Sequence, residues 1–135
     1  MCIRDSLEAA EALLGPAPEE VDLGMLKLEQ SRAALLRGDA EAAEELARES
    51  LAIFGPHHAS DQGDVWLALA DALSELGRVD EAETAYREAI ALLEAHSHTQ
   101  ELAQAYAGMA ALLERTGREV EAHEFRANAE ARETA

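Results

Sequence analysis

The sequence predicts an all-α fold, a right-handed helical-repeat solenoid made of antiparallel helix pairs. Three glycines, Gly38, Gly77 and Gly117, lie 39 and then 40 residues apart, and an acidic, alanine-rich segment follows each of them. Apolar residues recur at helical spacing around each glycine, and no alternating β-branched run indicates a strand. A fixed period of about 40 residues is typical of arrays whose unit is one helix pair. Such pairs stack because none can bury its apolar face alone.

The first three of seven expected helices end at residues that break helices. Glycine–proline pairs end the helices expected at about 6–14 and 39–54, because proline cannot continue a helix. The helix expected at about 19–37 ends before Gly38, a residue type that closes helices in the left-handed conformation. The short connections make sequential helices antiparallel neighbours.

The last four expected helices are bounded by the same types of capping and helix-ending residues. Asp61 is expected to cap the fourth helix, which ends near residue 76, before Gly77. A loop rich in histidine and serine separates the fifth helix from the sixth, and Gly117 separates the sixth from the seventh. These three helices are expected at about 79–95, 99–116 and 119–133.

The chain is expected to begin within a repeat. Leu13-Leu14-Gly15-Pro16 and Ile53-Phe54-Gly55-Pro56 are one period of 40 residues apart, so residues 1–18 correspond to the second half of a preceding unit. Residues 1–6 also resemble translated adapter sequence, which favours a truncated reading frame. The alternative is that Asp5 or Ser6 caps a genuine short first helix. The expected units are 19–56, 57–95, and 96–135, the last including a C-terminal cap.

Charge and composition exclude several classes of function. The chain has 28 Asp and Glu against 11 Lys and Arg, a net charge of −17, and Lys27 is its only lysine. Binding to a nucleic-acid backbone needs clustered basic residues, so direct contact with DNA or RNA is not expected. No apolar run approaches membrane-spanning length and no signal peptide is evident, which makes the cytoplasm the expected compartment. The acidic residues either keep an exposed surface soluble or form a platform for a basic partner.

The middle unit matches a known repeat pattern at its signature positions, which are Trp66, Leu69, Ala70, Leu73, Gly77, Ala82, Tyr86 and Ala89. The third unit supplies Tyr106, Met109, Ala110, Leu113, Gly117, Ala122 and Ala129, but places Phe125 one position early. The first unit keeps Gly38 and Ala43 and is otherwise degenerate, with Lys27, Ser31 and Ser50 at signature positions. The chain therefore resembles the tetratricopeptide-repeat family. It looks most like the arrays of about 40 residues per repeat found in bacterial helix-turn-helix transcriptional regulators.

The resemblance implies that small signature residues lie at helix crossings and that large ones fill the space between repeats. Trp66, the only tryptophan, is accordingly expected to be a buried anchor whose replacement by alanine costs about 3–5 kcal/mol.

The resemblance also implies a concave groove lined by the first helix of each pair. The residues expected to line it are Leu28, Arg32, Leu35, Asp64, Leu67, Asp71, Glu75, Gln104 and Arg115. Co-chaperone members of the family grip a peptide carboxylate with Lys and Asn, but here Leu67, Asp71, Ala107 and Ala111 take those places, so that activity is not carried over. The expected occupant is a protein or peptide, such as an amphipathic helix with basic flanks. Alternatively, the leucines pack against missing neighbours or another copy, and the N-terminal face self-associates.

No motif for catalysis or for a cofactor is present, so the expected function is a non-catalytic protein-interaction module. The first alternative, a regulatory segment of a bacterial transcription factor, comes from the resemblance. The second is a metal site formed by the loop histidines His57, His58, His96 and His98. This site is not expected, because the repeat places His58 and His98 about one helix spacing apart, roughly 10 Å, and no carboxylate stands at a ligand spacing from them.

Overall fold

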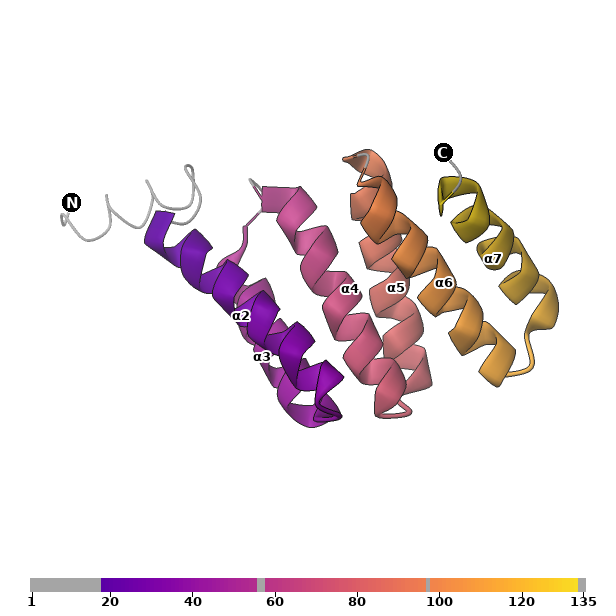
Figure 1. Cartoon of the computed structure of the whole chain (residues 1–135), viewed down its shortest axis with the longest axis horizontal. Coiled ribbons are helices and arrows are strands. Elements are labelled where there is room, and N and C mark those ends of the chain that lie inside the picture. The colour runs from indigo at the N-terminus through magenta and orange to yellow at the C-terminus, as the bar shows by residue number, and fades with distance from the viewer. Residues whose placement is uncertain (1–17, 56–57, 97, 134–135) are drawn as a thin grey trace, which may run out of the picture.

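The computed structural model describes residues 18–55, 58–96 and 98–133, and the predicted all-α solenoid is confirmed. The described residues contain no strand. Figure 1 shows the antiparallel helix pairs stacked in a row, with α2, α4 and α6 in front and α3 and α5 behind them. They are α2 (Pro18–Leu36), α3 (Ala40–Ile53), α4 (Ala59–Glu75), α5 (Val79–Ala95), α6 (Thr99–Arg115) and α7 (Glu119–Glu133).

The helix boundaries agree with the sequence prediction except at the start of α4. This helix begins at Ala59 and its N-cap is His58, whose side chain makes no capping hydrogen bond. Asp61, the expected cap, lies within the first turn instead. Its negative charge there still interacts favourably with the positive end of the helix dipole. The helix expected at 6–14 falls outside the described residues.

One turn geometry joins the two helices of every pair. Gly38, Gly77 and Gly117 have φ angles of +83°, +76° and +80°, in the left-handed region. In each turn the amide after the glycine donates to a carbonyl five residues back, for example Arg78 N to Leu73 O at 3.0 Å. This 6→1 bond satisfies a carbonyl that the helix end would leave unpaired, and it reverses the chain tightly.

The main core cluster extends from Leu28 in α2 to Ala129 in α7, so the pairs share one interior, and a small second cluster joins Ala34, Ala43 and Ala72. Small residues lie where the two helices of a pair cross. Ala70 and Ala89 occupy the crossing of α4 and α5 and have no exposed surface. Small side chains at such points let two backbones approach without forcing rotamers or leaving gaps.

Two buried serines replace these alanines in the first pair. Ser31 donates from Oγ to the carbonyl of Ala43 at 2.7 Å, and Ser50 donates from Oγ to the carbonyl of Gly24 at 2.7 Å. Each bond runs between α2 and α3 and satisfies a hydroxyl that burial would otherwise penalise. The pair that matches the family pattern least is therefore held at the same crossing by hydrogen bonds.

Trp66 differs from its expected role as a fully buried anchor. Its side chain is half-buried and packs against the core cluster from the side. The cost of about 3–5 kcal/mol for Trp66→Ala stays a prediction, and the partial exposure of the side chain favours the lower end of that range.

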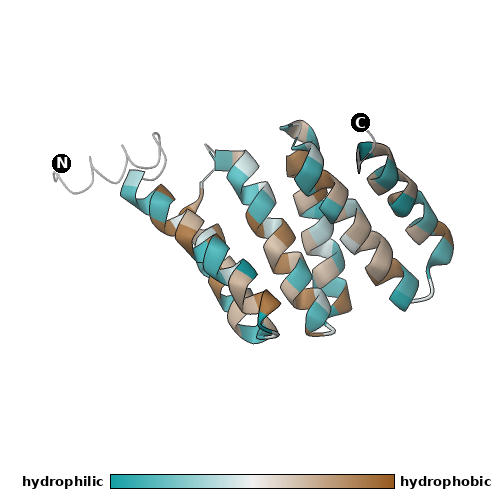
Figure 2. Ribbon diagram, in the orientation of Figure 1, coloured by the Kyte–Doolittle hydropathy of each residue, from teal (hydrophilic) through white to brown (hydrophobic). Residues whose placement is uncertain are grey.

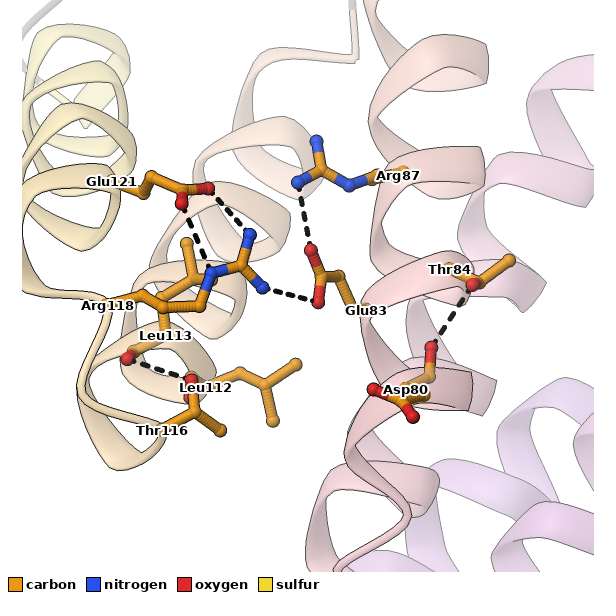
Figure 3. A network of polar contacts seen from close by, with 9 residues as sticks. All are labelled: Asp80, Glu83, Thr84, Arg87, Leu112, Leu113, Thr116, Arg118 and Glu121. Carbon is orange, nitrogen blue, oxygen red and sulfur yellow. Dashed lines mark hydrogen bonds and ion pairs between the residues drawn. The ribbon is translucent and has the colours of Figure 1, made fainter.

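Two repeated ion-pair bridges join neighbouring pairs. Arg118, in the turn before α7, contacts Glu83 of α5 at 2.8 Å and Glu121 of α7 at 2.7 Å (Figure 3). One repeat earlier, Arg78 contacts Glu44 of α3 at 2.7 Å and also binds Glu81 of α5. The hydrogen bond from Arg118 lowers the pKa of Glu83. The glutamates of the two bridges are mostly covered, with 17% of the Glu83 side chain and 16% of the Glu44 side chain exposed, whereas Arg118 and Arg78 are 39% and 41% exposed. Solvent around the arginines keeps the stabilisation modest, and the repeated bridges mark the register between pairs.

The last helix is the most polar of the row, and α7 is drawn largely in teal in Figure 2. Its Val120 is 78% exposed, whereas its Ala122 and Ala129 are buried against α6 and the core. None of the described helices combines the length and the apolar character that crossing a membrane requires.

We predict that Gly77→Ala destabilises the chain by about 1–2 kcal/mol, the cost of a left-handed conformation for an L-residue. A Cβ at Gly77 would meet nothing within 4 Å, so the loss would come from the backbone alone. Gly55→Ala is the matched control, because its site is equally open and its φ is not positive. Urea unfolding of the two variants measures the difference, and equal free energies would contradict the turn geometry.

We also predict that Ala82→Leu destabilises the chain by roughly 1–3 kcal/mol or more, because Ala82 is fully buried where added bulk forces backbone shifts. Ala91→Leu, on the exposed side of the same helix, should leave the melting temperature nearly unchanged. Thermal melts that respond equally to both substitutions would show that the assigned register is wrong.

Candidate functional site

The first helices of the three pairs enclose a hollow on one face of the row. Helix α4 contacts both α2 and α6, which places these three helices together along one side. The hollow has a volume of about 490 Å³. We call it the concave hollow, and its lining residues are Ser31, Arg32, Leu35, Leu36, Leu67, Ala68, Asp71, Gln100, Glu101 and Gln104.

Leucines form the apolar part of the concave hollow. Leu67 is buried at its floor, Leu35 is half-buried, and Leu36 at the end of α2 is 90% exposed. An isolated exposed leucine is ordinary on a protein surface, but here the exposed side chain borders a hollow with an apolar floor. This arrangement offers apolar surface to a ligand that enters from the side of α2.

Asp71 is the most perturbed acidic group of the concave hollow. The hydroxyl of Tyr86, a buried residue of α5, donates to Asp71 Oδ1 at 2.5 Å. Gly108 of α6 makes room for this contact, since a Cβ there would lie 2.6 Å from the tyrosine oxygen. Burial raises the pKa of Asp71 to about 6, although the Tyr86 hydrogen bond and the charge of Arg32 act in the opposite direction.

Five of the residues predicted from the sequence line the concave hollow together, namely Arg32, Leu35, Leu67, Asp71 and Gln104. The prediction for Leu28 is wrong, because Leu28 is fully buried in the core between α2 and its neighbours. Its position one turn before Arg32 suggested the same face, but Leu28 packs into the core cluster while Arg32 stays at the surface. The hollow also includes Gln100 and Glu101, which the sequence prediction missed because they lie in the first turn of α6.

The remaining predicted groove residues lie outside the concave hollow. Arg115 donates to Ser74 Oγ at 3.0 Å and to the Ser74 carbonyl at 3.2 Å, so its side chain ties α6 to α4. Glu75 is exposed at the end of α4. Asp64 lies near the start of α4, beside His98.

Among the described residues, three side chains could share a metal ion: Asp64, His98 and Glu101, whose ligand atoms lie within 4.8 Å of one another. Asp64 Oδ1 is buried without a hydrogen-bond partner, and it lies 3.8 Å from His98 Nδ1. Burial, followed by the charge of Glu101, raises the pKa of Asp64. The expectation that no carboxylate stands near a loop histidine is therefore wrong, because the contact forms between α4 and α6 and no local spacing reveals it.

The other histidines do not join this group. His58 Nδ1 lies 3.5 Å from Asp61 of its own helix, and His96 Nδ1 lies 2.9 Å from the carbonyl of Leu92. His57 falls outside the described residues.

Comparison with known proteins bears directly on the repeat. A family model described as "Tetratricopeptide repeat" matches residues 63–96, which span most of α4 and all of α5. The chain has the tetratricopeptide-repeat fold. Its structure is similar to the crystal structure of the TPR domain of Arabidopsis FLU, with a TM-score of 0.78 and 19% sequence identity over 86% of this chain and 99% of that one. No curated protein matches the sequence.

The tetratricopeptide-repeat fold explains why the concave hollow is lined by α2, α4 and α6. In each repeat the first helix packs between its partner and the first helices of the neighbouring repeats. Side chains on the free side of these helices then converge on the concave face, while the second helices form the outer layer. Six helices of the described chain follow this arrangement (Figure 1).

We predict that Asp71→Asn raises the free energy of unfolding at pH 7.5 by at most about 3 kcal/mol and changes it little near pH 4. Burial raises the pKa of Asp71 from 3.8 to about 6. Between these two pH values the Asp71 carboxyl therefore keeps its proton in the native state, whereas it has lost that proton in the unfolded chain. The stability contributed by that proton is complete below the unfolded pKa and is lost as the pH rises through the folded pKa. Asparagine keeps an acceptor for Tyr86 without the charge.

Urea unfolding between pH 4 and pH 7.5 measures the difference between the parent and Asp71→Asn. Glu88→Gln, which removes an exposed carboxylate of α5, is the control, because the charge of Glu75 itself raises the pKa of Asp71. Parallel pH profiles for the parent and Asp71→Asn would contradict the burial of a carboxyl with a raised pKa.

Proposed function

We propose that the chain is a non-catalytic protein-interaction module and that its concave hollow binds a short amphipathic segment of a partner protein. The observation that carries this proposal is that Leu35, Leu36 and Leu67 line the same hollow of about 490 Å³ as several polar side chains. A hollow of this size takes a few side chains, which is the scale of an anchor motif on one helix face. The tetratricopeptide-repeat fold supports interaction with protein as the general class of function.

Charge supports a partner whose apolar anchors are flanked by basic residues. Asp71 and Glu101 border the hollow and Glu75 is exposed nearby, whereas Arg32 is the only basic residue of the lining. The whole chain carries a net charge of −17, which attracts basic partners and repels acidic ones at a distance. Such steering acts on the association rate and weakens with added salt.

The test selects peptides from a displayed library of helix-forming sequences against the full chain and measures their affinity for two matched variants. Leu36→Ser removes an exposed leucine from the hollow, and Leu26→Ser removes a 53% exposed leucine from the same helix outside it. Because both side chains are exposed, neither variant should lose its fold.

We predict that selected peptides combine leucine-type anchors at helical spacing with lysine or arginine. Leu36→Ser should weaken their binding about tenfold, the effect of losing one buried apolar side chain at the interface. Leu26→Ser should leave the affinity unchanged. Selected peptides that are acidic, or whose affinity responds equally to both substitutions, would overturn the proposal.

A further inference from the structure

A second hollow lies on the opposite side of α4 from the concave hollow. Its volume is about 420 Å³, and α3, α4 and α5 line it. Leu69, Leu73 and Ala85 are buried at its floor, and Arg48, Trp66, Asp80, Glu81 and Thr84 form its walls and rim. We call it the convex hollow. Trp66 is half-buried there, so one side of its indole remains accessible.

In the next repeat, an aromatic side chain occupies the position equivalent to the convex hollow. One period along the chain, Arg87, Tyr106 and Phe125 stand at the positions of Arg48, Trp66 and Ala85. There the Phe125 ring lies 6.0 Å from the Tyr106 ring at a tilt of 43°, and the Arg87 guanidinium lies 6.0 Å from the Phe125 centroid. These are the spacings of favourable aromatic and cation–π contacts.

The earlier repeat has residues equivalent to the two that contact the Phe125 ring, but it has no equivalent of the ring itself. Arg48 and Trp66 are present, whereas Ala85 has only a methyl group where Phe125 has a phenyl ring. The convex hollow opens at that point, with Ala85, Trp66 and Arg48 among its lining residues. An aromatic ring placed here would meet Trp66 and Arg48, the counterparts of the Tyr106 and Arg87 that Phe125 contacts.

The charges at the rim define the neighbours of that ring. Asp80 and Glu81 are exposed on α5, and Thr84 donates from Oγ1 to the Asp80 carbonyl at 3.1 Å, as Figure 3 shows. The charge of Arg48 is already balanced by Glu44 at 2.9 Å and by Glu81 at 3.6 Å. Glu81 is paired with Arg78 as well as with Arg48, so Asp80 is the exposed acidic group that remains at this rim. Together with the net charge of −17, Asp80 favours basic residues beside the incoming ring.

We propose that the convex hollow is a second protein-binding site, which takes a phenylalanine or tyrosine side chain flanked by basic residues of a partner protein. The ring packs against Trp66 beneath the Arg48 guanidinium, in the place that Phe125 fills from within the chain one repeat later. This site lies across α4 from the concave hollow and does not depend on the function proposed for it.

The experiment follows the indole N–H signal of Trp66 and the amide signal of Thr84 in ¹⁵N-labelled full chain. The probes are the acetylated and amidated tripeptides Lys-Phe-Lys and Lys-Ala-Lys, which differ only in the ring. Lys-Phe-Lys should shift both signals saturably and bind about tenfold more tightly than Lys-Ala-Lys, the gain expected from aromatic and cation–π contacts.

Two matched variants separate the convex hollow from the rest of the surface. Thr84→Phe blocks the rim from an exposed position, and Ala91→Phe places the same ring on the exposed side of α5, two turns away. Both should fold, as circular dichroism melts would show. The Lys-Phe-Lys shifts should disappear in Thr84→Phe and persist in Ala91→Phe.

Four results would overturn the proposal. The two tripeptides could bind equally, or Thr84→Phe could bind as Ala91→Phe does, or the shifts could fall on Arg32 and Gln104 of the concave hollow instead. A Trp66 signal that moves with protein concentration in the absence of peptide would show that a second copy of the chain occupies the site, which would also contradict it.

Discussion

The close crossing of the two helices in each pair is the constraint on which the rest of the structure depends. At these crossings the chain carries Ser31 and Ser50 in the first pair and Ala70 and Ala89 in the second. Within the first pair, Gly24 of α2 also makes room for the ring of Phe54 at the end of α3, since a Cβ on Gly24 would lie 2.8 Å from Phe54 Cζ. With the backbones this near, larger residues must point between repeats, and they join the pairs into one core.

Both hollows follow from this stacking. The first helices pack on one another along one side, so the free sides of α2, α4 and α6 face a shared concave space. On the other side of α4, side chains of α3 and α5 approach above Leu69 and Leu73 without filling the gap. Differences at single positions then decide whether a side chain of the chain itself fills the gap. Phe125 does so in the last repeat, whereas Ala85 at the equivalent position of the preceding repeat leaves the gap open. A regular scaffold can in this way carry distinct sites without a change of fold.

Local signals in the sequence predicted most of the fold. The period, the turn glycines and the helical spacing of apolar residues place six described helices close to their expected ends. Contacts between repeats were harder to predict, because they depend on how far each pair rotates against the next. Asp64, His98 and Glu101 are an example, since α4 and the start of α6 bring them together although Asp64 is 34 positions from His98 and 37 from Glu101. Leu28 also depends on contacts outside its own helix, since it was expected in the groove and is fully buried in the core, whereas Trp66 packs against the core but stays partly exposed.

The central claim is that the three helix pairs share one core and unfold together, including the first pair with its serines. Native-state hydrogen exchange at increasing denaturant measures this directly. Slowly exchanging amides of α3, α4, α5 and α6 should converge on a single unfolding free energy as denaturant rises, because Leu28, Leu69 and Met109 belong to one cluster. A separate, lower unfolding free energy confined to α2 and α3 would contradict the claim and show that the first pair is only loosely attached to the array.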